Sequence, residues 1–287
     1  MSRRRRPALA GAIFSALFAL FFAMQAQASP GKLTEEFHKT YPLSPDGRVE
    51  LSNINGNVHI TAWDQNQVKV DAVKFANTKE RLDEMKIEVE SGSTYVSVET
   101  KYPEHDMTFN GGWDDPGGVE YTLTVPRNAR LDEIKLINGS LDIHGVNGEV
   151  RASCINGKLM AQDLQGRTEL STVNGHLDAR FQQVSGSSIE LKSVNGSVEV
   201  TLPSDVNAQL EASTVSGRID DDFGLPVNHH RWIGNDLRGE LGTGKTRVRL
   251  ENVNGRIEIH HANDGKAMSP AKNMSREDKD DDDDDRI

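Results

Sequence analysis

Residues 239–246 match the phosphate-binding loop pattern Gly-x4-Gly-Lys-Thr, in which backbone N–H groups and the lysine hold the phosphates of a nucleotide. Such a loop needs a buried strand before it and a helix after it, because the helix N-terminus completes the anion site. Here residues 232–238 are polar, and residues 247–250 alternate like a strand. We therefore interpret the match as fortuitous and predict no catalytic residues and no enzymatic activity.

Adjacent histidine pairs and a run of aspartates are the candidate metal ligands. The pairs are His229-His230 and His260-His261, and the aspartates occupy positions 220–222. Neighbours on a strand point to opposite faces, so neither pair converges on one ion, and zinc needs at least three convergent ligands. Calcium needs six or more oxygens, and the glycine-rich nonapeptide of calcium-binding β-rolls is missing. We predict surface histidines, a solvated acidic turn, and no metal or cofactor.

Tryptophans beside charged residues are the candidate ligand contacts. Trp113 precedes Asp114 and Asp115 in a glycine-rich stretch, so its ring could stack on a sugar. It could equally fold back to cover one end of the core. Trp232 beside Arg231 is a similar case. We retain Trp113, Asp114, Asp115 and Trp232 as predicted ligand contacts, with both interpretations open.

The first 28 residues have the pattern of an export signal. Arginines at positions 3–6 precede the apolar stretch 8–24, and Ala26-Gln27-Ala28 offers a small-x-small cleavage site. The alternative is an uncleaved membrane anchor, but this stretch of 17 residues falls short of the ~20 that a span needs. We expect cleavage before Ser29, no transmembrane span after cleavage, and an exported protein in the periplasm or at the cell surface.

The remaining chain is strongly acidic. Of 33 basic residues, 29 lie beyond position 6, against 44 acidic residues, which gives a formal charge of −15. A protein that binds phosphates needs a basic surface, so we exclude nucleic acid as a partner and expect no attraction to anionic lipid. Cys154 is the only cysteine, which excludes an intramolecular disulfide, and we predict a buried thiol that packs like a small apolar side chain.

A short repeat must position all of these residues. The pattern [Val/Ile]-Asn-Gly-x-[Val/Leu/Ile] occurs seven times, and from Gly139 to Gly175 the glycines recur every nine residues, a signature of a repeat architecture. Asn and Gly both tolerate positive φ, so we predict that each pair forms a corner of the chain. The predicted corners are Asn55-Gly56, Asn138-Gly139, Asn147-Gly148, Asn156-Gly157, Asn174-Gly175, Asn195-Gly196 and Asn254-Gly255.

Each repeat unit reads Gly-x-h-x-h-x-x-h-Asn, where h is an apolar residue. The first two apolar residues alternate with polar ones, as Val150 and Ala152 do, which predicts a strand with one buried face. We expect the apolar residue before each Asn, such as Ile155 or Val173, to point inward and seal the corner.

Two all-β folds fit this unit. In an antiparallel β-meander or sandwich, each Asn-Gly pair is a hairpin turn. In a β-solenoid, two units form one coil of about 18 to 21 residues, and equivalent corners stack about 4.8 Å apart. We favour the β-solenoid, built from 9–11-residue rungs, because the apolar positions keep the same register relative to every corner. Antiparallel pairing across Asn147-Gly148 and Asn156-Gly157 would contradict it.

The expected layout has four parts, the first being the signal peptide at 1–28. Residues 29–130 form a less regular β region, which contains the only stretch of helical composition, at 78–85. The repeat occupies 131–263 with an excursion at about 203–245, and the acidic tail at 264–287 is expected to be disordered. The β region and the excursion are the candidate caps of the repeat, whose unpaired end strands otherwise permit self-association.

Together these segments resemble a bacterial family of exported β-strand-repeat proteins named putative adhesins, a domain of unknown function. The resemblance spans residues 35–260 and rests on the order of several short motifs. They are residues 54–58 with Thr61-Ala62-Trp63, residues 121–126, the Val-Asn-Gly units, residues 193–198 with Leu202-Pro203, and residues 242–244 with 253–257. The resemblance implies an exported β-solenoid and carries over no catalytic residues.

We therefore expect a non-catalytic, adhesin-like binding or scaffolding protein of the bacterial cell envelope, whose partner is an envelope protein or a glycan. One alternative is a β-helix enzyme acting on polysaccharides, which needs two carboxyl groups about 5 to 9.5 Å apart. The outward residues of the repeat interleave both signs of charge, which favours a solvated face. Another alternative is a purely structural protein whose acidic tail, with aspartates at 280–285, docks a basic partner or cations.

Overall fold

The structure is a computed structural model that describes residues 32–102, 117–184, 187–230 and 234–274. These residues form twenty strands and one short helix, which confirms the all-β class. The predicted export signal and residues 275–287 of the predicted tail lie outside the described residues.

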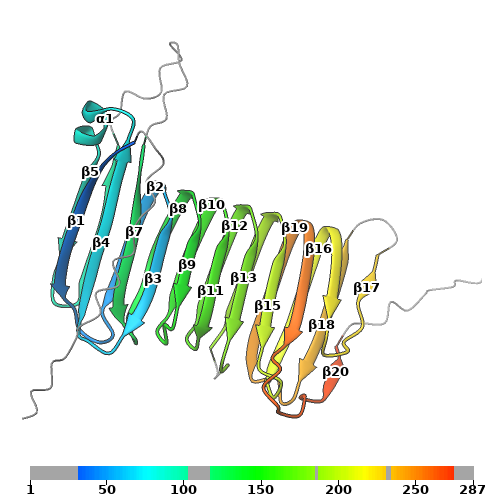
Figure 1. The fold of residues 1–287 in the computed structure, drawn as a ribbon. Helices are drawn as coiled ribbons and strands as arrows, with labels where there is room; N and C mark the ends of the chain where they lie inside the picture. Colours follow the sequence, from blue (N-terminus) through cyan, green and yellow to red (C-terminus); the bar gives the residue numbers. More distant parts are fainter. Residues whose placement is uncertain (1–31, 103–116, 185–186, 231–233, 275–287) are drawn as a thin grey trace, which may run out of the picture. The chain divides into compact units, whose positions relative to one another are not determined.

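Most strands belong to two parallel ladders (Figure 1). The first ladder contains, in spatial order, β6 (Tyr95–Lys101), β2 (Arg48–Asn55), β8 (Arg130–Asn138), β10 (Val150–Asn156), β12 (Thr168–Asn174), β14 (Ile189–Asn195), β19 (Thr246–His261) and β16 (Ala208–Asp221). The second contains β7 (Gly118–Pro126), β3 (Val58–Trp63), β9 (Leu141–His144), β11 (Leu159–Leu164), β13 (Leu177–Phe181) and β15 (Val198–Leu202). The long strands β19 and β16 continue from the first ladder into the second.

Equivalent asparagines pair with one another along the first ladder. Asn138 pairs with Asn156, Asn156 with Asn174, and Asn174 with Asn195, at sequence separations of 18, 18 and 21 residues. One turn of the chain therefore contributes one strand to each ladder. The strands on either side of Asn156-Gly157, β10 and β11, pair in parallel with strands one turn away and not with each other. The same holds for β9 and β10 around Asn147-Gly148, which contradicts the antiparallel alternative.

At both ends of the ladders the spatial order of the strands departs from their order in the chain. β6 and β7 follow β2 and β3 in the sequence, yet they pair on the side of β2 and β3 opposite to β8 and β9. At the other end, β19 lies between the β14–β15 turn and β16, although β16 comes first in the sequence. The expected excursion at 203–245 therefore contains an outer turn of the ladders.

Antiparallel strands extend the ladders at both ends. β4 (Gln67–Ala76) pairs with β7 and with β1 (Leu33–Pro42), while β5 (Lys86–Ser91) pairs with β6. At the other end, β18 (Asn235–Leu241) pairs with β16, β17 (Asn228–His229) and β20 (Ala271–Asn273). β20 falls within the predicted tail, so strand pairing continues past residue 264. The outer strands β1 and β5 carry exposed charged residues, which disfavour pairing with another chain.

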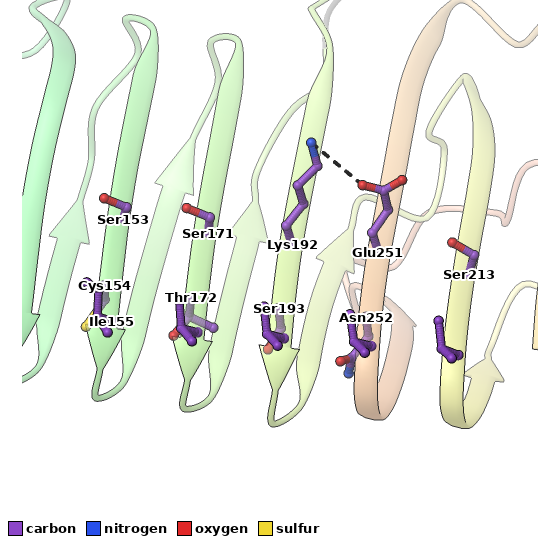
Figure 2. A pocket seen from close by; sticks show the side chains of 14 residues that line it. Ser153, Cys154, Ile155, Ser171, Thr172, Lys192, Ser193, Ser213, Glu251 and Asn252 are labelled. Carbon is purple, nitrogen blue, oxygen red and sulfur yellow. Dashed lines mark ion pairs between the residues drawn. The ribbon is translucent and has the colours of Figure 1, made fainter. Parts of the chain in front are cut away.

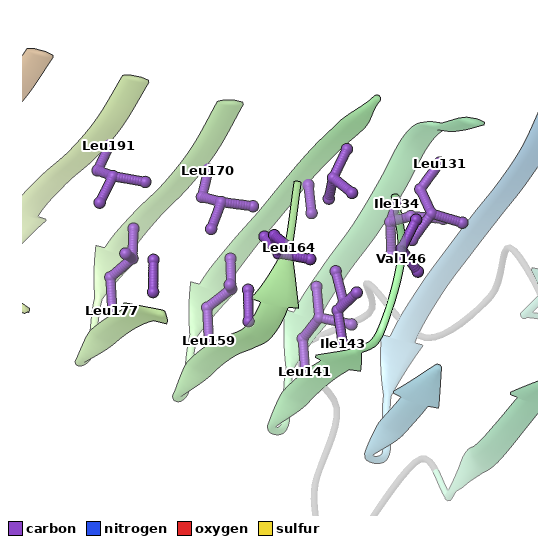
Figure 3. Close-up of a cluster of buried hydrophobic side chains, with 14 of the residues drawn as sticks. Leu131, Ile134, Leu141, Ile143, Val146, Leu159, Leu164, Leu170, Leu177 and Leu191 are labelled. Carbon is purple, nitrogen blue, oxygen red and sulfur yellow. The ribbon is translucent and has the colours of Figure 1, made fainter. Parts of the chain in front are cut away.

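Branched apolar side chains from the two ladders fill the space between them (Figure 3). Leu159 and Leu177 occupy paired positions on β11 and β13, and Leu170 and Leu191 do the same on β12 and β14. Burying a leucine in this way contributes about 2 kcal/mol. The predicted inward residues that are buried are Leu141, Ile143, Val146, Val150, Ala152, Leu159, Ala161, Leu164, Thr168, Leu170, Leu177 and Ala179.

The predicted inward orientation of the residue before Asn is wrong at the corners of the first ladder. Ile155 and Val173 are 40% and 38% exposed. Cys154 is buried, so strand alternation points Ile155 outward. In the unit that ends the second-ladder strand β11, Asp163 adopts φ 57° and the pairing register shifts, which returns Leu164 to the interior. The two kinds of unit thus differ by a local irregularity that the apolar pattern does not reveal.

The predicted helical stretch forms α1 (Lys79–Glu84). The Thr78 side chain caps it by accepting a hydrogen bond from the Arg81 N–H at 3.3 Å. Leu82 and Met85 are buried against Ala76, as the predicted apolar face requires. No helix in the described part of the chain is long and apolar enough to cross a membrane.

Candidate functional site

The asparagines at the corners of the first ladder form a continuous hydrogen-bonded stack. The Asn156 side-chain amide donates to Oδ1 of Asn138 at 2.9 Å, and Asn174 donates to Asn156 at 2.9 Å. Equivalent bonds of 2.8 to 3.0 Å join Asn138 to Asn55, Asn195 to Asn174 and Asn254 to Asn195. These asparagines do not have positive φ, which among the described non-glycine residues occurs only at Asp163. The side-chain stack, and not the conformational freedom that we predicted, accounts for Asn at these corners.

The glycines of the same corners are required by the close approach of successive turns. A Cβ atom added to Gly157, Gly175 or Gly196 would lie 1.8 Å from the carbonyl oxygen of the glycine in the preceding turn. Ordinary contact begins at 3.4 Å, so any side chain would force the turns apart. The glycine N–H groups also link the turns, as Gly157 does by donating to the Asn174 carbonyl at 3.0 Å.

The corner Asn147-Gly148 belongs to the opposite edge of the ladders. A Cβ on Gly148 would lie 2.1 Å from the Ala129 carbonyl oxygen, and one on Gly166 would lie 2.2 Å from that of Gly148. The residue before Gly166 is Gln165, so an Asn side-chain stack is confined to the first edge within the described residues. The predicted corners therefore fall into two structural classes.

A column of β-branched apolar side chains borders the asparagine stack on the outer face of the first ladder. This apolar column consists, in spatial order, of Ile54, Ile137, Ile155, Val173, Val194, Val253 and Val215. Its members are 36% to 51% exposed. With turns about 4.8 Å apart, the column is about 29 Å long. Single exposed apolar residues are normal on proteins, whereas a contiguous row marks an interaction surface.

A groove of about 490 Å³ lies beside the apolar column (Figure 2). Its lining includes the column from Ile155 to Val215 and the hydroxyl-bearing residues Ser153, Ser171 and Ser213. Figure 2 shows Ser153 and Ser171 on neighbouring strands, and the Lys192–Glu251 ion pair lies on the two strands between Ser171 and Ser213. None of the lining residues is aromatic. The groove therefore offers apolar contacts and hydroxyl hydrogen bonds, but no ring on which a sugar could stack.

Ion pairs lie on the outer face of the first ladder next to the groove, and two of their members, Lys192 and Glu251, line it. Lys192 contacts Glu190 at 2.5 Å and Glu251 at 3.6 Å, and Arg249 contacts Glu251 at 2.5 Å. The hydrogen bond from Lys192 is the main reason why the pKa of Glu190 lies below its ordinary value. Such exposed pairs contribute little to stability. The lowered pKa favours the ionised form of Glu190, which is unsuitable for a general acid in glycoside hydrolysis.

Small polar residues occupy the interior directly behind the apolar column. Thr172, Ser193, Asn252 and Thr214 lie in adjacent turns and are at most 4% exposed. Each has a side-chain oxygen without a hydrogen-bond partner in the structure. An unpaired buried polar atom costs about 1 to 3 kcal/mol. The core beneath the column is therefore less favourable than the leucine-rich core beside it.

The predicted ligand contacts Trp113, Asp114, Asp115 and Trp232 lie outside the described residues. The Gly-x4-Gly-Lys-Thr match at residues 239–246 has a strand on each side, because it begins in β18 and Thr246 is the first residue of β19. The phosphate-binding motif therefore lacks its helix, which supports a fortuitous match.

The histidine pairs and aspartates have separate partners. His229 Nδ1 lies 2.6 Å from Asn235 Oδ1, and His230 pairs with Asp236. His260 Nδ1 lies 2.8 Å from Asp222 Oδ2, and this hydrogen bond raises the pKa of His260. The other two aspartates have different partners. Asp220 pairs with Arg218 at 3.1 Å, and Asp221 accepts a hydrogen bond from the Leu225 N–H at 2.7 Å.

Parallel strands with stacked corners and an exposed apolar column define a class of all-β repeat protein. The chain belongs to the Toastrack DUF4097 family, whose model matches residues 48–260. This finding confirms the resemblance seen in the sequence.

Solved structures show distant likenesses. One is a putative cell adhesion protein from Clostridium sporogenes ATCC 15579, with 13% identity, a TM-score of 0.49, and coverage of 79% of this chain and 100% of that one. Another is a putative adhesin from Bacteroides fragilis NCTC 9343, with 10% identity, a TM-score of 0.26, and coverage of 78% and 97%. A third is a putative lipid binding protein from Parabacteroides distasonis ATCC 8503, with 10% identity, a TM-score of 0.31, and coverage of 79% and 97%. No curated protein matches the chain.

Proposed function

We propose that this chain is an exported, non-catalytic binding protein of the bacterial cell envelope that contacts a partner protein through the apolar column and its groove. The proposed scaffold is a β-solenoid in which two rungs of 9–11 residues form each turn. The parallel pairing of residues 18 to 21 apart supports this scaffold. The export signal pattern of the first 28 residues supports the location.

The single observation that carries the proposal is the continuity of the apolar column. Its side chains project from strands fixed on both sides by backbone pairing, as Val173 does between β10 and β14. Branched side chains have few rotamers to lose, so burying them against a partner costs little conformational entropy. The column therefore has the properties of a preorganised binding surface.

The chemistry of the groove favours a protein over a glycan. Glycan binding relies on aromatic rings, and none lines the groove. Serine hydroxyls such as those of Ser153 and Ser171 can pair with the backbone groups of a partner protein. The Lys192–Glu251 pair adds both a donor and an acceptor.

Site-specific crosslinking tests the proposed surface. A photo-crosslinker attached to the Val173→Cys variant is compared with one attached to Lys158→Cys, an exposed position just past the equivalent corner one turn earlier and directly before the second-ladder strand β11. The native Cys154 does not interfere, because it is buried and its pKa is raised to about 11 by that burial. We expect an adduct of defined mass in intact envelopes from position 173 and not from position 158.

A second substitution tests whether the adduct depends on the apolar character of the column. Val194→Asp places a charge beside position 173 at a residue that is 40% exposed, so the fold tolerates it. We expect it to remove the adduct formed from position 173. Equal crosslinking from positions 158 and 173, or an adduct that survives Val194→Asp, would refute the proposed function.

A further inference from the structure

The outer face of the second ladder carries a row of acidic residues in successive turns. Asp178 on β13 pairs in register with Glu199 on β15, and Glu199 pairs with Glu258 on β19. Like charges directly opposite each other on neighbouring strands are destabilising unless a cation offsets them. Each carboxylate in this row therefore needs a positive partner.

In the outer turns, which contain β19 and β16, an arginine two residues before each acidic residue supplies the positive charge. Arg256 contacts Glu258 at 2.7 Å, and Arg218 contacts Asp220 at 3.1 Å. The equivalent positions in the inner turns are His176 and Ser197 instead. Glu199 instead has two more distant nitrogen neighbours, His176 Nε2 at 3.7 Å and Arg180 Nη2 at 4.0 Å.

Three side chains converge in the inner turn where His176 stands at the position that arginine occupies in the outer turns. His176, Asp178 and Glu199 each offer one ligand atom, and all three atoms lie within 4.8 Å of one another. In a tetrahedral zinc site with bonds of about 2.1 Å, ligand atoms are separated by about 3.4 Å. The 3.7 Å between His176 Nε2 and Glu199 Oε2 is already close to this separation. Small rotations of the side chains would complete it.

The His176 ring is oriented so that one nitrogen can bind a metal ion. His176 Nδ1 lies 2.6 Å from the Ser197 hydroxyl, which leaves Nε2 facing the two carboxylates. A hydrogen bond at one ring nitrogen is the usual means by which proteins fix the other nitrogen toward a metal. Asp178 is also held in place, because it is only 4% exposed despite its charge.

We propose that His176, Asp178 and Glu199 form a binding site for a divalent transition-metal ion such as Zn²⁺. One imidazole nitrogen and two carboxylate oxygens are three ligands, which leaves the remaining coordination position to water or to a ligand from solution. The imidazole favours zinc and its neighbours in the transition series over Ca²⁺ and Mg²⁺, which prefer oxygen-only sites. The prediction of no metal from the sequence was based on the paired histidines and the aspartate run, and did not include these three residues.

The Arg180 guanidinium group would compete with the metal ion for the Asp178 carboxylate. It donates to both oxygens of Asp178, with Nη2 at 3.1 Å from Oδ2 and Nε at 3.2 Å from Oδ1, and the Arg180 side chain is 51% exposed. It can therefore swing into solvent when a cation binds between the carboxylates. Removing its charge should tighten metal binding, because two like charges about 4 Å apart in water repel by about 1 kcal/mol. This amounts to roughly fivefold in affinity.

Isothermal titration of the purified chain with Zn²⁺ tests the site. We expect one Zn²⁺ ion per chain at this site, affinity lowered by more than about 100-fold in His176→Gln, and affinity raised roughly fivefold in Arg180→Gln. Asp178→Asn is the second ligand variant and should resemble His176→Gln. Thermal unfolding without metal checks that each variant is folded.

The matched control is His59→Gln. His59 contacts Asp142 at 2.9 Å on the same face, but the next residue along that row is Met160, and no third histidine, cysteine or carboxylate among the described residues converges there. This variant should bind Zn²⁺ as the unchanged chain does. Equal Zn²⁺ affinity in His176→Gln and the unchanged chain, no Zn²⁺ binding at all, or equal affinity for Ca²⁺ and Zn²⁺ would each overturn the proposal. None of these outcomes bears on the apolar column, which lies on the first ladder.

Discussion

Gly175→Ala tests whether the stacked corners hold successive turns together. The added methyl group would lie 1.8 Å from the Gly157 carbonyl oxygen, whereas ordinary contact begins at 3.4 Å. The turns must therefore separate by about 1.6 Å at this corner, the difference between those two distances. Because the obstacle is backbone and not a flexible side chain, no rotamer change relieves it.

The expected cost follows from the bonds that such a separation breaks. Gly157 donates to the Asn174 carbonyl at 3.0 Å, and Asn174 donates to the Asn156 side chain at 2.9 Å. Each lost bond costs about 1 kcal/mol, and displacement of the packed side chains beneath the corner adds about 1 to 3 kcal/mol. We therefore expect Gly175→Ala to lower the free energy of unfolding by about 3 to 5 kcal/mol.

Denaturant unfolding followed by circular dichroism measures this loss. The control is Gly265→Ala, at a glycine with φ 73° and no atom within 4 Å of an added Cβ. That variant measures the cost of a left-handed backbone without a steric obstacle, about 1 to 2 kcal/mol, whereas Gly175 does not have a positive φ and its cost would come from the close approach. If Gly175→Ala were no less stable than Gly265→Ala, close approach would not be the reason for glycine at the corners.

Three further predictions concern buried and titrating groups. Thr172→Val removes a buried hydroxyl without a partner, so it should raise the free energy of unfolding by about 1 kcal/mol in the same assay, and a loss would contradict the assignment. Cys154 should resist iodoacetamide at pH 8 until the chain is unfolded, because burial raises its pKa to about 11; rapid native labelling would refute this. The Asp222 hydrogen bond raises the pKa of His260, so its stabilisation is fully present below pH 6.5 and is lost as the pH rises through the folded pKa. His260→Gln should therefore flatten the dependence of stability on pH just above 6.5, and an unchanged profile would count against the pair.

The apolar period was sufficient to predict the strands, the corners and most of the core. It failed where a single residue changes strand alternation. Asp163, with φ 57°, makes the Leu164 unit differ from the Ile155 unit, and the sequence pattern is the same in both. The alternation Val150, Ala152, Cys154 was the available signal that Ile155 points outward.

The candidate metal site could not be predicted from the sequence for a different reason. Asp178 and Glu199 occupy polar positions of the repeat, and only the 21-residue separation of Asn174 and Asn195 brings them into register. A strict 18-residue coil would have paired Asp178 with residue 196 instead. The order of the end turns could not be predicted either, because equivalent repeat units carry no signal for which neighbour they pair with.

The placement of β19 reverses the order of the strands in the chain. Residues 246–261 follow β14, β15 and β16 in the sequence, yet they pair on one side with β14 and β15 and on the other with β16. A chain cut after β18 would not be one turn shorter; it would have an empty slot between two matched strand edges. A separate peptide of residues 246–261 has the register to fill that slot. The two ladders are thus joined at this end by a strand inserted between two turns that precede it in the chain.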